Sequence, residues 1–284
     1  MRFSRWPSDP DDAAWVEVLT RAADRAAEAV AAIPPGDRGM EVGRGEGGDT
    51  TLVIDRDAEA AIIEVLEQAH AQGLRFDLIS EEVGHRGFDG DGTLVIVDPI
   101  DGSRNARRGL PEVAVSLAVT DGPRLSDARV GVLRHLGTGE TVVAVRGEGV
   151  RVDGAPMPGR PYRGLWLTVV EGASPRRLAA AMQHLSHTSR IRSLGSLALS
   201  IQHVALGRLD GLAVLRPGRV VDIAAAMLIA REAGVIVTDE HGAPLDAEAD
   251  MDWRGAMAVA RVPDDVAPLT AAVRAALDAG KRGT

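Results

Sequence analysis

The sequence predicts a protein of mixed α+β and α/β class with two intimately packed halves. In the first half, two helical stretches precede short apolar runs that alternate with polar residues between glycine turns, as in an antiparallel meander. After residue 164, single strands and helices alternate instead. The chain has 284 residues, 45% of them hydrophobic, which suffices for a large core and lies near the upper limit for one compact domain.

Two amphipathic helices are expected near the start of the chain. Asp11 to Ile33 has apolar residues at helical spacing after the cap Ser8-Asp9-Pro10. Asp55 to Gln72 repeats the pattern after a short extended stretch from Thr50 to Ile54. Asp37 to Gly48, between them, is so rich in glycine that we expect no regular element. We favour a mobile lid for this stretch, with a loose linker as the alternative.

Apolar runs predict the strands of the first half. Strands are expected at Arg75–Ser80 and Thr93–Asp98, with a loop from Val83 to Gly92 between them. The meander continues with strands at Val113–Thr120, Arg129–Arg134, Glu140–Arg146 and Val150–Val152. We therefore expect residues 1–153 to form an N-terminal half, with two helices on a mixed, largely antiparallel sheet.

Residues 154–284 are expected to form a C-terminal α/β half. A proline-containing junction from Gly154 to Gly164 leads into it. The expected order is a strand at Leu165–Val170, a helix at Ser174–Leu185, a strand at Ile191–Arg192, a helix after Gly195-Ser196, a strand at Leu212–Leu215, a helix at Asp222–Ala233, strands at Val235–Thr238 and Ala256–Ala260, and a helix at Pro263–Ala279.

Composition excludes several classes of function. With 41 acidic and 32 basic residues the net charge is −9, so nucleic acid is a poor partner and divalent cations are better ones. The chain has no cysteine, which excludes disulfides, zinc–thiolate sites and a cysteine nucleophile. No apolar run reaches membrane-spanning length, and the first residues lack a signal-peptide core. We expect a cytoplasmic protein without a membrane partner.

The run from Thr93 to Val97 predicts a buried strand that ends on Asp98. Open α/β sheets place ligands at such strand ends, and Pro99 keeps Asp98 extended so that the following loop brings Asp101 close. Two carboxylates about 5 Å apart repel by roughly 3 kcal/mol at an effective dielectric of about 20, and a bound cation relieves this repulsion. Oxygen ligands favour Mg²⁺ over zinc. A simple Asp-Pro turn capped by a second aspartate is the alternative.

Two other acidic positions extend this pattern. Glu81-Glu82 ends the strand at residues 75–80, and Asp222 begins an apolar helix. Taken alone, the glutamate pair is typical of a solvated surface and Asp222 of an N-cap. Because the predicted strand at Thr93–Asp98 also ends on an acidic residue, they indicate a metal site instead. The histidines, His135 and His203 among them, have no ligand spacing, so we expect neither a metal site nor a general base from them.

The chain resembles the inositol monophosphatase family of Mg²⁺-dependent, lithium-sensitive sugar phosphatases. The resemblance covers most of the chain and rests on Ser80 to Gly84, Asp98 to Asn105, Leu194 to Leu197 and Val221 to Ala225. It is strongest to the archaeal-type branch, which hydrolyses both inositol monophosphate and fructose-1,6-bisphosphate. It implies the sugar-phosphatase fold, a layered α-β-α-β-α sandwich, and a homodimer.

The resemblance also implies the metal ligands. Glu81, Asp98 and the backbone carbonyl of Ile100 would bind a first Mg²⁺. Asp98, Asp101 and Asp222 would bind a second, so that Asp98 bridges the pair. A third, weaker ion would use Glu81, and Mn²⁺ would be able to replace Mg²⁺.

The catalytic residues implied in the same way are Asp55, Glu81 and Ser103. Asp55 and Ser103 would position the attacking water, with Ser103 standing where many relatives have threonine. Asp101, Gly102 and Ser103 would hold the phosphate. The alcohol part of the substrate, or a second phosphate, would meet Gly195, Ser196, Arg192, Arg216 and Arg219.

The sequence thus predicts a phosphomonoesterase for a small phosphorylated polyol or sugar of the inositol monophosphate type. The alternative is a fructose-1,6-bisphosphatase, alone or as a second activity; a non-catalytic regulatory protein on the same fold is less expected. Arg107 and Arg108 stand close to a position where relatives often carry an aromatic residue. They indicate an anionic substrate or, alternatively, a solvated surface.

Overall fold

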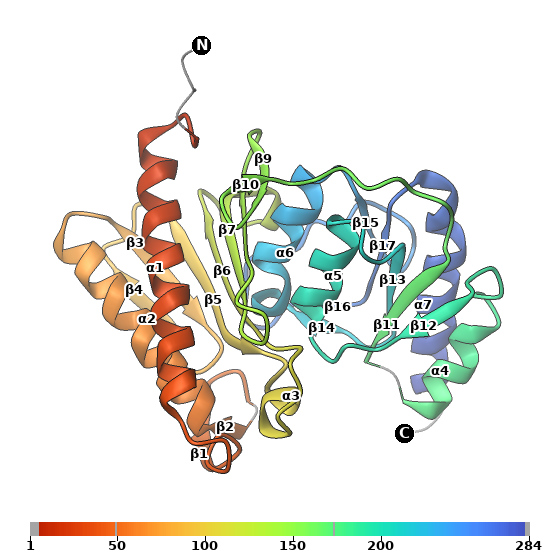
Figure 1. Ribbon diagram of the computed structural model, residues 1–284, viewed down its shortest axis with the longest axis horizontal. Coiled ribbons are helices and arrows are strands. Elements are labelled where there is room, and N and C mark those ends of the chain that lie inside the picture. The colour runs from red at the N-terminus through yellow and green to blue at the C-terminus, as the bar shows by residue number, and fades with distance from the viewer. Residues whose placement is uncertain (1–5, 49, 173, 282–284) are drawn as a thin grey trace.

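The computed structural model describes residues 6–48, 50–172 and 174–281, which form layers in the order helices, sheet, helices, sheet, helices (Figure 1). The three helical layers are α1 (Pro10–Ala32) with α2 (Val53–Ala71), α5 (Leu197–Ala205) with α6 (Val220–Glu232), and α4 (Pro175–Met182) with α7 (Val266–Lys281). One apolar core joins α1 and α2 to the first sheet, a second surrounds α5 and α6 between the sheets, and a third joins α4 and α7 to the second sheet. The predicted α-β-α-β-α layering is confirmed.

The first sheet has eight strands in the order β10-β9-β8-β7-β6-β5-β3-β4. Only β3 and β5 run parallel, so the sheet is mixed and largely antiparallel, as predicted. Its strands are β3 (Phe76–Ser80), β4 (Gly84–Phe88), β5 (Leu94–Asp101), β6 (Ala114–Thr120), β7 (Ala128–His135), β8 (Thr141–Val145), β9 (Gly149–Val152) and β10 (Ala155–Pro156).

The second sheet has five strands in the order β12-β11-β13-β17-β15, and its first three are parallel. Its strands are β11 (Leu167–Glu171), β12 (Arg190–Arg192), β13 (Gly211–Val214), β15 (Ile236–Asp239) and β17 (Met257–Ala260). The short pair β14 (Gly218–Arg219) and β16 (Arg254–Gly255) lies outside it. Two single 3₁₀ turns lie at Leu125–Asp127 and Pro263–Asp265. The division of the chain after residue 153 stays a prediction.

Helix α1 shows why the N-terminal sequence folds as it does. The Asp9 side chain accepts a hydrogen bond of 2.8 Å from the Asp11 N–H, and Pro10 occupies the first turn, where it loses no hydrogen bond. Trp15 and Leu19 are buried against the first sheet. The Trp15 ring meets Phe76 of β3 edge to face, with centroids 5.5 Å apart.

Two local expectations are wrong. Within the glycine-rich stretch, β1 (Glu41–Arg44) pairs with β2 (Thr50–Leu52) as an antiparallel hairpin. Within the expected loop after residue 83, β4 pairs with the edge of β3. Every residue of β1 and three of the five in β4 are exposed, so backbone pairing forms these strands without an alternating apolar pattern.

Two boundaries near the site also differ from the prediction. Helix α2 begins at Val53, which places Asp55 inside its first turn. Strand β5 does not end at Asp98 but continues to Asp101, with a register shift against β6 between the two aspartates. This irregularity lets both carboxylates leave one strand close together.

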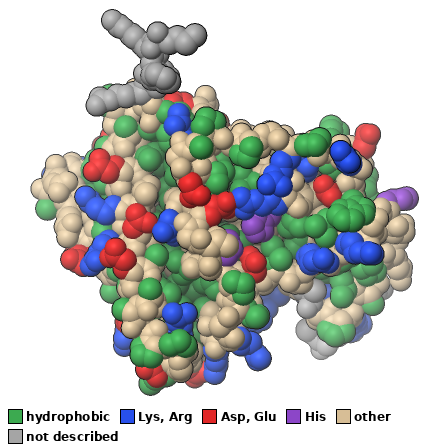
Figure 2. Space-filling view, viewed as in Figure 1, with side chains coloured by type: hydrophobic (Ala, Val, Ile, Leu, Met, Phe, Trp, Pro, Cys, Tyr) green, Lys and Arg blue, Asp and Glu red, His purple; other side chains and the backbone are tan. Residues whose placement is uncertain are grey.

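The surface carries charged side chains of both signs. Figure 2 shows acidic and basic side chains interspersed over one face of the molecule, without a field of one sign. Among the described residues, each helix is too short or too polar to cross a membrane.

Candidate metal and phosphate site

Three carboxylates from three elements converge at one end of the first sheet. Glu81 directly follows β3, Asp98 lies on β5, and Asp222 lies in the first turn of α6. The parallel pairing of β3 with β5 places Glu81 beside Asp98, since the Glu81 N–H donates to the Val97 carbonyl at 3.3 Å. One oxygen atom from each carboxylate lies within 4.8 Å of the others. This spacing is suitable for a divalent cation with oxygen ligands.

A buried glutamate on α2 holds the Glu81 segment in place. The Glu59 carboxylate accepts hydrogen bonds from the Ser80 hydroxyl and from the Val83 N–H, the latter at 3.1 Å. Glu59 was not predicted from the sequence. Its signal was present, because Glu59 lies four residues after Asp55 and therefore on the same face of the helix.

The Asp101 carboxylate lies beside this group and is bound to the start of α5. It accepts hydrogen bonds from the Ser196 hydroxyl and from the N–H groups of Leu197 and Ala198, at 3.2 and 2.7 Å. Ser196 is fully buried and also caps α5 through the Leu199 N–H. The Ser196 hydroxyl, expected at the substrate, therefore orients Asp101 in this structure.

The acidic groups destabilise one another in their charged forms. Burial raises the pKa of Asp98 well above its usual range, and the neighbouring charges of Glu81, Asp101 and Asp222 raise it further. Burial also raises the pKa of Glu81 to about 7, against the lowering effect of Arg219. Burial together with the Asp222 charge raises the pKa of Asp101 to about 7, although its hydrogen bonds oppose this. The site therefore favours either protons or a bound cation.

One cation of the chain already lies in the cluster. The Arg219 guanidinium Nη2 is 2.6 Å from Glu81 Oε1 and 3.2 Å from Asp222 Oδ1. Arg219 was predicted to meet the alcohol part or a second phosphate of the substrate, whereas the structure pairs it with two of the predicted metal ligands. This pairing also raises the pKa of Arg219, against the effect of burial.

Asp55 lies near the cluster, and Ser103 lies at the adjoining pocket. The Asp55 Oδ2 accepts a 2.8 Å hydrogen bond from the Leu52 N–H, and burial raises its pKa to about 7, assisted by Glu82 and Glu81. Ser103 begins the short helix α3 (Ser103–Arg107) and lines the adjoining pocket.

Gly102 precedes α3 with a φ of +92°. A Cβ atom there would lie 2.7 Å from the Glu112 carbonyl oxygen, so the turn after Asp101 requires glycine at this position.

The pocket beside the acidic cluster has a volume of about 840 Å³, which is suitable for a small phosphorylated sugar. Asp101, Gly102, Gly195 and Asp222 line it. Its wall is basic and contains Arg104, Arg177, Arg216, Arg219 and Arg254.

Three of the arginines that the sequence suggested as contacts of an anionic substrate are not among the described residues that line this pocket. Arg192 is exposed on the edge strand β12, and it is not among the described residues that line the pocket. Arg107 and Arg108 are exposed as well, and Arg107 lies 3.5 Å from Glu41 of β1. Of the predicted substrate contacts, the structure brings Gly195, Arg216 and Arg219 to the pocket.

A second buried glutamate, also not predicted from the sequence, holds the Gly195 loop. Glu171 ends β11, and its Oε1 accepts hydrogen bonds from the Leu194 N–H at 2.8 Å and the Ser200 hydroxyl at 2.7 Å. On the other side of the loop, the Asn105 amide donates to the Leu194 carbonyl at 2.7 Å. An acid at the end of an apolar strand was the available signal, as at Glu81.

A profile of the inositol monophosphatase family matches residues 11–275 of this chain. The chain belongs to the inositol monophosphatase family. It is 33% identical over 248 residues to a fructose-1,6-bisphosphatase/inositol-1-monophosphatase of Methanothermobacter thermautotrophicus, which covers 82% of this chain and 86% of that protein. It is also 33% identical over 236 residues to Nus factor SuhB of Salmonella typhimurium, covering 79% of this chain and 85% of that protein.

The same family is found among solved structures. An inositol monophosphatase–fructose 1,6 bisphosphatase superposes with a TM-score of 0.79 at 25% identity, covering 91% of this chain and 99% of that one. As an inositol monophosphatase family member with relatives named as phosphatases, the chain is a phosphoric monoester hydrolase. The family is metal-dependent, and the group of Glu81, Asp98 and Asp222 is able to hold a metal ion.

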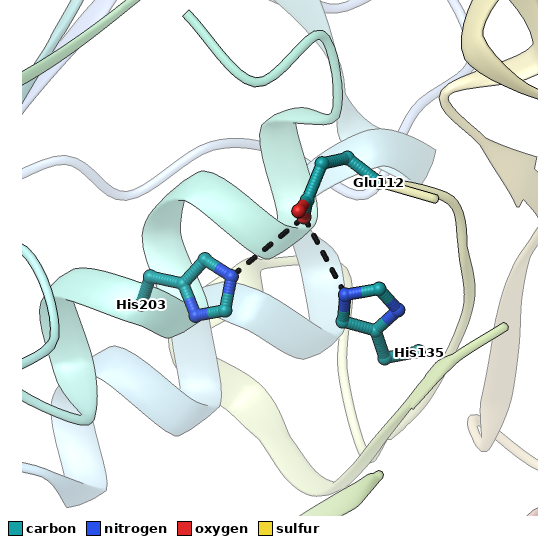
Figure 3. A group of neighbouring side chains, drawn as sticks. All are labelled: Glu112, His135 and His203. Atoms are coloured by element: carbon teal, nitrogen blue, oxygen red, sulfur yellow. Dashed lines mark ion pairs between the residues drawn. The ribbon is translucent and has the colours of Figure 1, made fainter. Parts of the chain in front are cut away.

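This inositol monophosphatase family member has a further polar group that sequence analysis did not foresee. Figure 3 shows Glu112 before β6, His135 at the end of β7 and His203 on α5 pointing toward one another. The Glu112 Oε2 atom lies 3.4 Å from His135 Nε2 and 3.8 Å from His203 Nε2. Their spacing in the sequence did not indicate that the fold brings this pair together.

Hydrogen bonds assign the protons of both rings. The His135 Nδ1 faces the Gly137 N–H at 3.1 Å, and the His203 Nδ1 faces an Arg208 guanidinium nitrogen at 3.4 Å. Both Nδ1 atoms therefore accept, and the ring protons lie on Nε2, toward Glu112. One ligand atom from each of the three residues lies within 4.8 Å of the others, as in the Glu81 group, but a metal-bound imidazole normally donates from its second nitrogen, whereas both Nδ1 atoms accept here. The group brings side chains of the first sheet and of α5 close together.

Proposed function

We propose that this chain is a Mg²⁺-dependent phosphomonoesterase for a small phosphorylated polyol or sugar of the inositol monophosphate type. The observation that carries the proposal is the convergence of Glu81, Asp98 and Asp222 beside a basic pocket of about 840 Å³. Carboxylate oxygens supply the donor set that Mg²⁺ prefers, and the arginines of the wall suit a phosphorylated substrate.

The residues fit the metal that the family implies. The carboxylates are buried, mutually repelling and partly neutralised by a guanidinium, which is the condition that a divalent cation relieves. Glu81, Asp98, Asp101, Asp222 and the carbonyl of Ile100 would hold two or three Mg²⁺ ions, with Mn²⁺ as a substitute. When bound, the metal would supply Lewis-acid activation of water and neutralise charge on the phosphate.

The chain's own groups would do the remaining work. Asp55, with a pKa of about 7, is suited to accept a proton from the attacking water near neutral pH. The Ser103 hydroxyl would orient that water. Gly102 and Ser103 would meet the phosphate from the pocket wall, where both residues lie.

A fructose-1,6-bisphosphatase activity is the second candidate. Arg177, Arg216 and Arg254 extend the basic wall beyond the acidic cluster, which supports binding of a second phosphate. Relatives that are named as both fructose-1,6-bisphosphatase and inositol-1-monophosphatase support the same reading. Relatives named Nus factor SuhB motivate a third reading, a regulatory role on this fold.

Phosphate release distinguishes these functions. We expect release from inositol monophosphate in Mg²⁺ but not in EDTA, with kcat/KM for fructose-1,6-bisphosphate measured alongside. Asp98→Asn is the control that removes a central carboxylate charge without changing side-chain size. A higher kcat/KM for the bisphosphate would favour the second candidate. Absence of release from a panel of sugar and polyol phosphates would favour the regulatory role.

A further inference from the structure

The position of Arg219 is the feature of the site that the proposed function does not explain. Arg219 ends β14 and directly precedes α6, so its backbone and its side chain both reach Asp222. Its N–H donates to Asp222 Oδ2 at 3.0 Å, and its Nε donates to Asp222 Oδ1 at 3.2 Å. The end of the same guanidinium lies 2.6 Å from Glu81 Oε1. One side chain thus connects two carboxylates from different halves of the sequence.

These contacts involve the carboxylates that a metal would need. Glu81 and Asp222 are two of the three residues whose oxygens lie within 4.8 Å of one another. The side chains of all three partners are largely buried, with exposed fractions of 17% for Arg219, 14% for Glu81 and 16% for Asp222. The guanidinium and a divalent ion would therefore compete for the same oxygens, with little water to screen their repulsion.

Gly47, in the turn after β1, lies against this arrangement. The Gly47 N–H donates to the Glu81 carbonyl at 3.0 Å. A Cβ atom on Gly47 would lie 3.3 Å from the Arg219 Nη1 atom, so Gly47 packs directly on the guanidinium. Arg216 provides a contrast, because it lines the same pocket but is exposed. Arg219, unlike the exposed Arg216, is thus in close contact with the acids.

We propose that Arg219 is the resident counter-cation of the metal site and exchanges partners when the site is loaded. Without metal, it neutralises Glu81 and Asp222. With metal bound, it leaves these oxygens and pairs with the phosphate from the pocket wall that it already lines. Metal loading and phosphate binding are thereby coupled through one side chain. This inference rests on the proposed metal site.

Titrations of the purified full-length chain by calorimetry test the exchange. Mg²⁺ is titrated into the metal-free protein, and inorganic phosphate is then titrated into the protein at saturating Mg²⁺. We expect Arg219→Gln to bind Mg²⁺ about tenfold more tightly than wild type, because no guanidinium has to be displaced, and to bind phosphate about tenfold more weakly. Arg216→Gln is the matched control, and its Mg²⁺ affinity is expected to equal that of wild type.

Arg219→Lys separates displacement from simple charge. Lysine keeps the positive charge but carries all its donors on one nitrogen, so it loses the separate contact that the Arg219 Nε makes with Asp222. If Arg219 acts by occupying the oxygens, the lysine variant also binds Mg²⁺ more tightly than wild type. Circular dichroism establishes that each variant is folded.

Several results would overturn the inference. Wild-type Mg²⁺ affinity in both Arg219 variants would show that the guanidinium does not compete with metal. Weaker Mg²⁺ binding would show that it holds the acids in place for the metal, and unchanged phosphate binding in Arg219→Gln would exclude the exchange of partners. In each of these cases wild type still binds Mg²⁺, and the proposed function stands. If wild type itself binds no Mg²⁺, the proposed function fails together with the inference.

Discussion

Replacing Asp55 is expected to change how the unfolding free energy depends on pH. Burial raises its pKa from 3.8 to about 7, and the neighbouring Glu82 and Glu81 charges contribute. A carboxyl group with a raised pKa in the folded state stabilises the fold while it is protonated. That stabilisation is present below about pH 4 and is lost as the pH rises to about 7.

The magnitude follows from the size of this shift. One pKa unit corresponds to about 1.4 kcal/mol, so ionising Asp55 between pH 5 and pH 8 costs about 3 kcal/mol of folding free energy. Asp55→Asn removes this cost. The asparagine amide oxygen remains able to accept the Leu52 N–H, so the start of α2 keeps its hydrogen bond.

Urea unfolding in EDTA at pH 5 and pH 8 measures the effect. From pH 5 to pH 8, the unfolding free energy of wild type is expected to fall by about 3 kcal/mol more than that of Asp55→Asn. This difference corresponds to roughly 5 °C in Tm. Asp57→Asn is the matched control, since Asp57 lies on the same helix, is 35% exposed and pairs with Arg56. The change in its unfolding free energy between pH 5 and pH 8 is expected to stay within about 0.5 kcal/mol of the wild-type change. An identical pH dependence in wild type and Asp55→Asn would refute the argument that Asp55 is ionised at a cost.

Three further substitutions address other parts of the site. Asp98→Asn is expected to abolish turnover and keep the fold, by phosphate release and circular dichroism; wild-type activity would contradict the metal assignment. Gly102→Ala is expected to lose at least about 2 kcal/mol of unfolding free energy in urea, because its φ is +92° and a Cβ would meet the Glu112 carbonyl; unchanged stability would mean that the turn relaxes. Glu171→Gln is expected to lose about 1–3 kcal/mol of unfolding free energy and to raise KM, because the carboxylate accepts hydrogen bonds at both of its oxygens beside Gly195, whereas an amide has one oxygen. An unchanged KM would show that this loop does not contribute to substrate binding.

The sequence predicted the helices and the central strands because these bury one face. Trp15 and Leu19 on α1 and the apolar run of β5 are buried at the positions that periodicity indicates. The strands β1 and β4, which it missed, are mostly exposed edge elements. Their backbone pairing depends on a neighbouring strand and leaves little pattern in the local sequence.

The acidic residues of the site were predictable for a related reason. Glu81 and Asp98 each follow an apolar run, and their parallel strands bring the two carboxylates to the same edge of the sheet. Residues that act across long sequence separations were not predictable in this way. The pairing of Arg219 with Glu81 spans 138 positions of the chain, and His135 meets His203 only because α5 packs against the first sheet. Such contacts are fixed by the packing of the layers and have no local sequence signal.

Mg²⁺-dependent phosphate release from inositol monophosphate tests the central claim most directly. The purified chain is assayed at pH 8 over a range of Mg²⁺ concentrations, with EDTA and Asp98→Asn as the two controls. We predict release that rises to saturation with Mg²⁺ and is absent from both controls. Release that is equal in EDTA and in Mg²⁺, or equal in Asp98→Asn and wild type, would contradict the account.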